Sequence, residues 1–188
     1  IHSAVTGQVI ARAGQQVLNV PEMMAFARDT GGPALRAMTF HDRAKMLKAL
    51  ATYLNQHKEQ LYELSYHSGT TRADAAIDIE GGIGTVFAYS GIARRELPDE
   101  SFAIEGGDER LSAKGSFVGR HILTPKHGVS LHINAFNFPC WGMLEKLAPT
   151  LLAGVPAIIK PASSTAYLTE LMVRRMIESQ ILPRHHHR

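Results

Sequence analysis

Residues 133–160 read INAFNFPCWGMLEKLAPTLLAGVPAIIK, and this stretch decides the fold. The apolar segment 129–133 is typical of a β-strand, and the turn Phe-Asn-Phe-Pro at 136–139 follows it. A helix is expected next, broken near Gly154, and then a second apolar strand at 157–159. The pattern therefore predicts a strand–turn–helix–strand unit whose two strands are parallel neighbours.

This unit would bring Asn137 and Lys160 to the carboxyl ends of neighbouring strands, where open α/β sheets bind their ligands. A neutral side-chain amide such as that of Asn137 can donate a hydrogen bond to a ligand oxygen that becomes an oxyanion during a reaction. The competing interpretation is that Asn137 only shapes the turn. Lys160 can reach the ribose or phosphate of a nucleotide, although a lysine at a strand end is often only solvated.

Two other features suggest chemistry but have simpler explanations. Cys140 follows Pro139 at a helix start, where the helix dipole can lower the pKa of a thiol. The chain offers no evident base for it, so we expect a buried packing residue. The segment Gly82-Ile83-Gly84 lacks the third glycine and the preceding strand of a dinucleotide fingerprint. We expect it to allow close packing between helices.

Hydrophobic periodicity, caps and turn residues predict the remaining elements. Most are helices, and the chain begins with a short hairpin. In chain order, the expected elements are a hairpin over 4–11, a helix from Asn19 that stops at 31–33, a long helix from Thr39 to Gly69, a helix over 72–93, a turn-rich region at 97–117, a strand at 117–123 and a final helix over 165–179.

We expect an α/β fold in which long helices precede the first part of a Rossmann-like parallel sheet, so that the domain is incomplete. The chain is divided accordingly into 1–96 (hairpin and helices packing on the nucleotide domain), 97–127 (exposed hairpin strands), 128–183 (strand–helix–strand–helix of a nucleotide domain) and 184–188 (a non-native tail). Such a sheet would expose an unpaired edge.

Composition argues for a globular protein of the cytoplasm. The chain has 188 residues, 45% of them hydrophobic, and a formal net charge of +3. No apolar run approaches the roughly 20 residues of a membrane span, and no basic stripe indicates nucleic-acid binding. The single cysteine excludes an internal disulfide and fits a reducing compartment.

Both ends of the sequence suggest a piece of a longer chain. No methionine precedes Met23, so we expect a missing stretch upstream. The tail Arg-His-His-His-Arg at 184–188 cannot continue as a strand, and a reading-frame slip or a tag remnant explains it equally well. A native metal site is disfavoured, because adjacent histidines do not share one helix face.

The turn and the strand end resemble those of the aldehyde dehydrogenase superfamily, which has an Asn-Phe-Pro turn and a Lys-Pro strand end at this spacing. The resemblance implies that Asn137 is the oxyanion donor. It also implies a cofactor site formed by Ile133, Asn134, Ala135, Phe136, Lys160 and Ser163. The family's nucleophilic cysteine, general-base glutamate and Gly-rich loop lie further downstream, so this looks like the front part of an enzyme.

Departures from the family pattern carry information about the cofactor. Ser163 stands where many members have a glutamate that would repel a 2′-phosphate, and a serine can instead donate a hydrogen bond to it. The resemblance therefore implies NADP, or the use of both NADP and NAD. Phe136 and Ala135 replace a common tryptophan and proline, which marks a divergent subfamily.

Longer stretches, at 31–40, 68–74, 78–85 and 134–146, are similar to the aldehyde dehydrogenase domain of the bifunctional protein of bacterial phenylacetate degradation. That protein couples a semialdehyde dehydrogenase to an oxepin-CoA hydrolase. The semialdehyde dehydrogenases of aerobic benzoyl-CoA breakdown share these motifs. The resemblance implies oxidation of a CoA-linked semialdehyde to an acid by a homo-oligomeric enzyme. It also implies that the strands of residues 97–127 are oligomerisation strands. The alternative is a catalytically inactive fragment that serves only assembly or binding.

Overall fold

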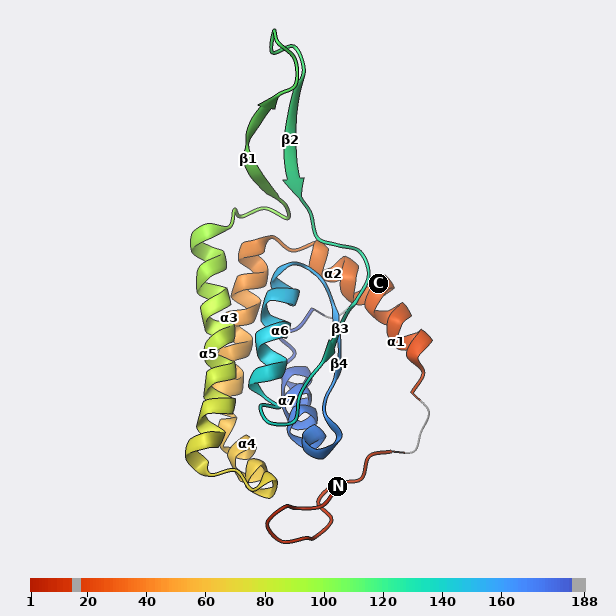
Figure 1. The fold of residues 1–188 in the computed structure, drawn as a ribbon, viewed down its shortest axis with the longest axis vertical. Helices are drawn as coiled ribbons and strands as arrows, with labels where there is room; N and C mark the ends of the chain where they lie inside the picture. The colour runs from red at the N-terminus through yellow and green to blue at the C-terminus, as the bar shows by residue number, and fades with distance from the viewer. Residues whose placement is uncertain (15–17, 184–188) are drawn as a thin grey trace.

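The computed structural model describes residues 1–14 and 18–183 as a helical body from which a β-hairpin projects (Figure 1). Along the chain, the helical elements are α1 (Val20–Phe26), the π-helix η1 (Ala27–Gly31), α2 (Gly32–Arg36), α3 (Phe40–Gln56), α4 (Lys58–Ser65), the 3₁₀ turn η2 (Tyr66–Ser68), α5 (Arg72–Glu96), α6 (Trp141–Leu152), the 3₁₀ turn η3 (Ser163–Thr165) and α7 (Ala166–Glu178). The strands are β1 (Ala103–Arg110), β2 (Val118–Leu123), β3 (Ser130–Ile133) and β4 (Ala157–Lys160).

The predicted strand–turn–helix–strand unit is confirmed. β3 and β4 pair in parallel, with Ser130 opposite Ala157 and Ile133 opposite Lys160. α6 connects them and ends near Gly154, whose positive φ of 80° is the left-handed conformation that commonly ends a helix. The α/β class and the incomplete parallel sheet expected from the sequence are therefore what the fold shows.

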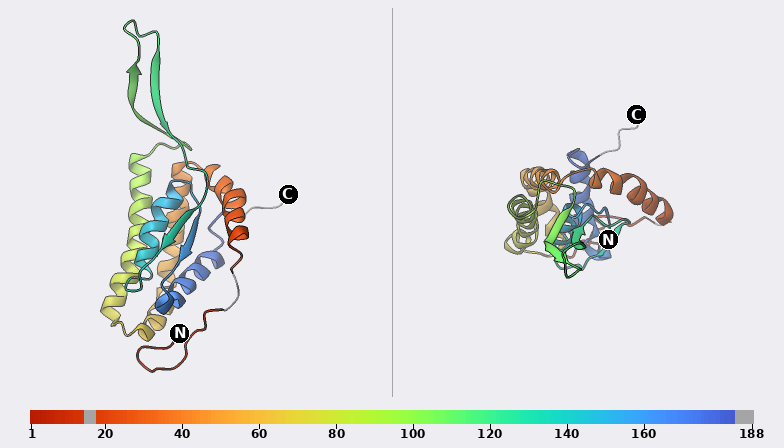
Figure 2. Two further views of the ribbon diagram at one scale, coloured as in Figure 1. Left: turned by 45° about the vertical axis from the view of Figure 1, so that its right-hand side comes forward. Right: turned by 90° about the horizontal axis from the view of Figure 1, so that it is seen from above.

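In the part of the chain that the structure describes, helices cover the face of this small sheet that carries His132 and leave Leu131 and Ile133 exposed. His132 on β3 is 5% exposed, whereas its neighbours Leu131 and Ile133 are 62% and 67% exposed. Alternate residues of a strand point to opposite faces, so the face carrying His132 is the buried one. Figure 1 and the turned view in Figure 2 show α6 and α7 beside the sheet.

The core lies among the helices, where α5 packs against both α3 and α6. The apolar stripe of α3 and α4, at the helical spacing from which the long helix was predicted, is buried at Ala44, Leu47, Leu50, Leu54 and Leu61. Leu64 at the end of the stripe is only partly buried.

Close packing of α5 against α6 depends on its glycines. A Cβ at Gly82 would lie 2.9 Å from the Cα of Trp141, and one at Gly81 would lie 2.7 Å from the Trp141 ring. The expected packing role is confirmed for Gly82. It is wrong for Gly84, where a Cβ would meet nothing within 4 Å.

The predicted helix stop at 31–33 is wrong. The helix that begins at Asn19 continues through η1 into α2 and ends at Arg36. Gly31 and Gly32 both have right-handed helical φ and ψ angles, and Pro33 lies in the first turn of α2, where a missing backbone N–H costs little. The π-helical turn η1 lies between α1 and α2, so the three helical segments are continuous along the chain.

The long helix predicted from Thr39 to Gly69 is instead divided at His57. Thr39 caps α3 by accepting a hydrogen bond from the Asp42 N–H, as the pattern predicted. The ring Nδ1 of His57 lies 2.8 Å from the Tyr53 carbonyl, the group that the His57 N–H would bond in a continuous α-helix. The His57 N–H bonds to Leu54 instead, and the chain bends there.

Residues 97–127 contain the hairpin of β1 and β2, which stands clear of the helical body (Figures 1 and 2). Its ladder runs from Ala103 opposite Leu123 to Arg110 opposite Val118, and the register shifts between Glu105 and Glu109. The first predicted hairpin is reduced to a turn with a single bridge between His2 and Val9. The tail at 184–188 lies outside the described residues.

Candidate active site

Two loops meet at the carboxyl end of the parallel sheet, as the sequence predicted for this pair of strands. The Asn134 N–H donates to the Lys160 carbonyl at 3.1 Å, and this bond continues the ladder into the loops. The Thr165 hydroxyl, just after β4, donates to the Phe136 carbonyl at 3.1 Å. Figure 1 shows both loops leaving the sheet at the same end, beside α7.

Asn137 lies on the loop after β3 with its side chain exposed. It lines a cavity of about 350 Å³ between this loop and the ends of α4, α5 and α7. Hydroxyl, carboxylate and apolar groups share the wall, among them Ser68, Asp74, Asp78 and Phe138. An amide in this position can donate a hydrogen bond to a ligand in the cavity.

The residues predicted to bind a cofactor fall into two groups. Ile133, Ala135, Phe136, Lys160 and Ser163 are all exposed. They lie on the strand ends and their loops, so the structure brings them to one end of the sheet. Lys160 and Ser163 are not among the residues that line the cavity with Asn137.

Asn134 differs from the rest of the predicted cofactor group. Its side chain is only 5% exposed, and within the described ranges neither its amide nitrogen nor its amide oxygen has a hydrogen-bond partner. It points to the same face of the sheet as His132, away from the exposed Ile133. The contribution of Asn134 to the loop that the structure shows is therefore its backbone hydrogen bond to Lys160.

Cys140 is a packing residue, as the sequence indicated. Its side chain is fully buried. Burial raises the pKa of the Cys140 thiol well above its usual value, and the nearby carboxylate of Asp78 raises it further. A protonated, enclosed thiol is a poor nucleophile, so Cys140 does not fit the role of the attacking thiolate.

The imidazole of His132 is buried between β3 and α6, next to the candidate site. His132 Nε2 is 3.1 Å from the Thr150 hydroxyl of α6. Burial lowers the pKa of His132, and the positive charge of Lys146 lowers it further. His132 is therefore held neutral and joins β3 to α6.

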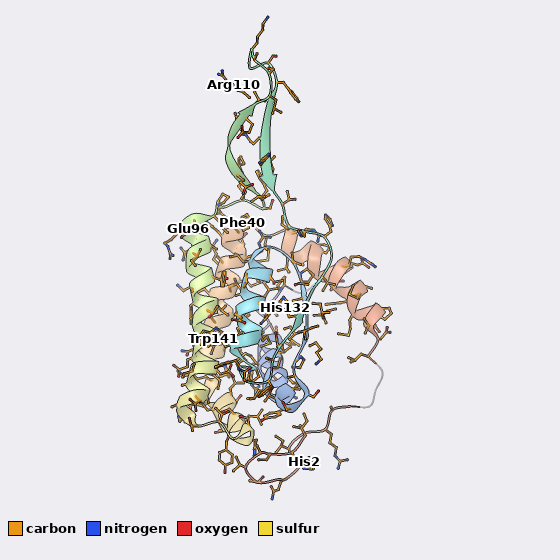
Figure 3. The ribbon with its side chains drawn as sticks, viewed as in Figure 1. His2, Phe40, Glu96, Arg110, His132 and Trp141 are labelled. Atoms are coloured by element: carbon orange, nitrogen blue, oxygen red, sulfur yellow. The ribbon has the colours of Figure 1, made fainter. Side chains whose placement is uncertain are left out.

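Sequence reasoning missed Asp78 as a residue of this region, although it lies within the motif at 78–85. Asp78 is on α5, 7% exposed, and its carboxylate accepts hydrogen bonds from the Cys140 and Trp141 N–H groups (Figure 3 labels Trp141). One local signal existed: the residues before α6, Pro139 and Cys140, cannot cap a helix well. No pattern in the sequence says which distant side chain replaces the missing cap.

Within residues 1–14 and 18–183, no cluster of histidine, cysteine and carboxylate side chains is arranged to hold a metal ion. The same ranges contain no helix that combines the length and the apolar character needed to cross a membrane.

The chain belongs to the aldehyde dehydrogenase family, whose family model matches residues 1–185. Enzymes of this family use NAD or NADP. The chain is 42% identical over 180 residues to 3,4-dehydroadipyl-CoA semialdehyde dehydrogenase of Aromatoleum evansii. This alignment covers 95% of the chain and 35% of that protein. The chain is 29% identical over 147 residues to an NADP-dependent D-glyceraldehyde dehydrogenase of Picrophilus torridus, covering 77% of this chain and 27% of the relative.

Among solved structures, the fold is similar to that of an NAD-dependent benzaldehyde dehydrogenase from Corynebacterium glutamicum. The TM-score is 0.76 with 23% identity, over 95% of this chain and 37% of the other. The chain thus spans about a third of the length of its relatives. The similarity of folds covers the helical body, the hairpin and the start of the parallel sheet.

Proposed function

We propose that this chain is the first part of an NADP-using aldehyde dehydrogenase that oxidises a CoA-linked semialdehyde to its carboxylic acid. The placement of Asn137 carries the proposal: an exposed amide on a tightly held turn, lining a cavity at the carboxyl end of a parallel sheet. The 42% identity to an enzyme named for a CoA-linked semialdehyde supports the substrate class.

In this reaction Asn137 would act on the oxygen of the bound aldehyde. As a thiolate adds to the carbonyl carbon, negative charge develops on the oxygen, and the Asn137 amide donates a hydrogen bond that is stronger to the oxyanion than to the carbonyl. NAD(P) supplies the hydride acceptor when bound. The thiolate has to come from the remainder of the subunit, because Cys140 is enclosed and protonated.

The choice of NADP rests on Lys160 and Ser163. Both side chains are exposed, on the strand end and the 3₁₀ turn that follow β4. A lysine and a serine both donate hydrogen bonds, and neither repels a 2′-phosphate. We infer that NADP is used at least as well as NAD.

The finer substrate assignment is the semialdehyde of bacterial phenylacetate degradation, which the sequence motifs favour. A second candidate is 3,4-dehydroadipyl-CoA semialdehyde, the substrate named for the Aromatoleum evansii relative. Comparing kcat/KM for the two CoA-linked semialdehydes, and for the same aldehydes without CoA, would choose between them.

We also propose that the hairpin takes part in a homo-oligomer in the cytoplasm. β1 and β2 expose apolar side chains, with Ile104 49%, Val118 48%, Ile122 56% and Leu123 52% exposed. Exposed apolar groups gathered on a projecting arm are typical of a protein–protein contact.

A direct test uses a subunit with the full length of its relatives and, beside it, the 188-residue chain alone. We expect the long subunit to reduce NADP in the presence of a CoA-linked semialdehyde, and the short chain to show no turnover. The alternative, an inactive assembly or binding fragment, predicts no turnover from either protein. Turnover by the short chain would contradict the proposed division of the site and would require a role for Cys140.

A further inference from the structure

The first turn of α6 has no cap of its own. Pro139 has no backbone N–H, and the side chain of the N-cap residue, Cys140, makes no capping hydrogen bond. Helix N-termini leave several N–H groups without partners inside the helix, and such groups are costly when buried. Those of Cys140 and Trp141 therefore need an acceptor from elsewhere in the chain.

Asp78 of α5 supplies that acceptor across more than sixty residues of sequence. Its Oδ1 accepts from the Trp141 N–H at 2.7 Å, and both of its oxygens lie 3.2 Å from the Cys140 nitrogen. A carboxylate at the start of a helix also gains from the helix dipole. The small surface of Gly82, one turn further along α5, lets the two helices come close enough for these bonds.

Two carbonyl groups of the loop that precedes α6 are held by threonines of η3 and α7. The Thr165 hydroxyl donates to the Phe136 carbonyl at 3.1 Å, and the Thr169 hydroxyl of α7 donates to the Pro139 carbonyl at 3.2 Å. Both threonines are buried, at 7% and 3% exposed. The backbone on either side of Asn137 is thus fixed by side chains from two other elements.

Within residues 1–14 and 18–183, the hydrogen bonds to the carboxylate of Asp78 come from backbone N–H groups and not from a cation. Burial raises the pKa of Asp78, and the bonds from Trp141 and Cys140 oppose that effect. A buried carboxylate is expensive unless it is hydrogen-bonded, and the Cys140 and Trp141 N–H groups supply those bonds to the carboxylate of Asp78. Its presence beside the loop of Asn137 points to a requirement for fixed geometry.

We propose that Asp78 is a positioning residue for the oxyanion site. Its carboxylate holds the first turn of α6 so that the Asn137 amide is presented to the cavity in one orientation. The inference rests on the proposed function of Asn137. Small displacements of a positioned group can cost about 10²-fold in rate, so the effect of losing Asp78 should appear in kcat.

The test uses Asp78→Ala and Asp78→Asn in the full-length enzyme, with Glu80→Gln as the matched control. Glu80 is on the same helix, but its carboxylate is exposed and accepts from Tyr62 and Lys58 instead of the turn. We expect Asp78→Ala to lower kcat about 10–10²-fold per folded active site, with the KM for NADP unchanged. Asp78→Asn keeps an acceptor oxygen and should recover part of the loss, and Glu80→Gln should match the wild type.

A double variant separates positioning from general destabilisation. If Asp78 acts through Asn137, Asn137→Ala combined with Asp78→Asn should lose no more kcat than Asn137→Ala alone. Losses that multiply would overturn the inference, as would a full kcat in Asp78→Asn. The asparagine variant is nearly isosteric, so it decides the question even if the alanine variant does not fold.

Amide hydrogen exchange provides a readout that does not need activity. In Asp78→Asn, exchange in the peptide spanning residues 136–142 should accelerate relative to wild type and Glu80→Gln. Unchanged exchange in Asp78→Asn would contradict the proposal that Asp78 holds the first turn of α6. If the wild-type enzyme oxidises no aldehyde but exchange still accelerates in Asp78→Asn, the proposed function fails and the structural role of Asp78 stands.

Discussion

The hairpin of β1 and β2 and the turn between β3 and α6 are fixed in opposite ways. The hairpin is held mainly by its own ladder and by a surface ion pair between Arg120 and Asp108, both about half exposed. The turn is held by buried side chains of Asp78 and Thr169, which come from distant helices. The segment proposed to touch the reacting oxygen is thus fixed by long-range contacts, and the segment proposed to touch another subunit by local ones.

This difference predicts where substitutions should change the structure and the activity of the subunit. A loop fixed by several buried hydrogen bonds has one arrangement, and a change in any supporting element shifts it. An arm whose side chains are exposed accepts changes with little effect on its own subunit. The predictions below test that contrast, starting with the largest expected effect.

Gly82→Ala should displace the first turn of α6 through a steric contact from α5. The new Cβ would meet the backbone of Trp141, which cannot move without shifting the first turn of α6. We expect a loss of about 1–3 kcal/mol in the free energy of unfolding, as is usual for overpacking. Chemical denaturation of the full-length protein measures it.

Gly84→Ala is the matched control on the same helix. Its Cβ would meet nothing within 4 Å, so the higher helix propensity of alanine should leave stability equal or raised by up to about 1 kcal/mol. Equal losses of unfolding free energy in Gly82→Ala and Gly84→Ala would contradict the proposed steric contact between α5 and α6.

Ser163→Glu should change the choice of cofactor. A carboxylate at the exposed start of η3 would repel a 2′-phosphate held near Lys160, and we expect the ratio of kcat/KM for NADP over NAD to fall roughly tenfold. Ser163→Gln, of similar size and without charge, should change the ratio little. A parent enzyme that already prefers NAD strongly would show that this interpretation of Ser163 is wrong.

Ile122→Asp should have the smallest effect on the subunit itself. Ile122 is 56% exposed on β2, so we expect the unfolding free energy of an isolated subunit to change by no more than about 0.5 kcal/mol. The mass measured by light scattering should fall if the hairpin forms an oligomer contact. Glu105→Gln on the paired strand is the control, and an unchanged mass for Ile122→Asp would count against the proposed contact.

Features fixed by interactions between residues close in the sequence were mostly predicted, and those fixed by contacts between distant residues mostly were not. The unit around residues 129–160 was predictable because strand periodicity, turn residues and Gly154 are local signals. The break at His57 was missed because the periodicity continues through it, and the contact of the His57 ring with the Tyr53 carbonyl has no signal in the hydrophobic pattern. The cap from Asp78 was missed because it joins residues more than sixty positions apart, and only the fold brings them together.

The stop expected at 31–33 failed for another reason. Glycine and proline are compatible with helix termination, but they do not require it when the backbone stays in the right-handed region. A Cβ at Gly31 would lie 3.3 Å from the Cβ of Pro156, so this part of the helix packs closely beside the start of β4. Local preference gave way to packing there.

The central claim is that Asn137 stabilises the oxyanion in an aldehyde dehydrogenase, and the kcat of Asn137→Ala in the full-length enzyme tests it most directly. We expect kcat to fall about 10²–10³-fold, the usual loss for one oxyanion donor, with the protein still folded and still binding NADP. Asn137→Gln, whose amide is displaced by one methylene, should also be impaired. A fully active Asn137→Ala enzyme would contradict the account and leave Asn137 as a residue that only shapes the turn.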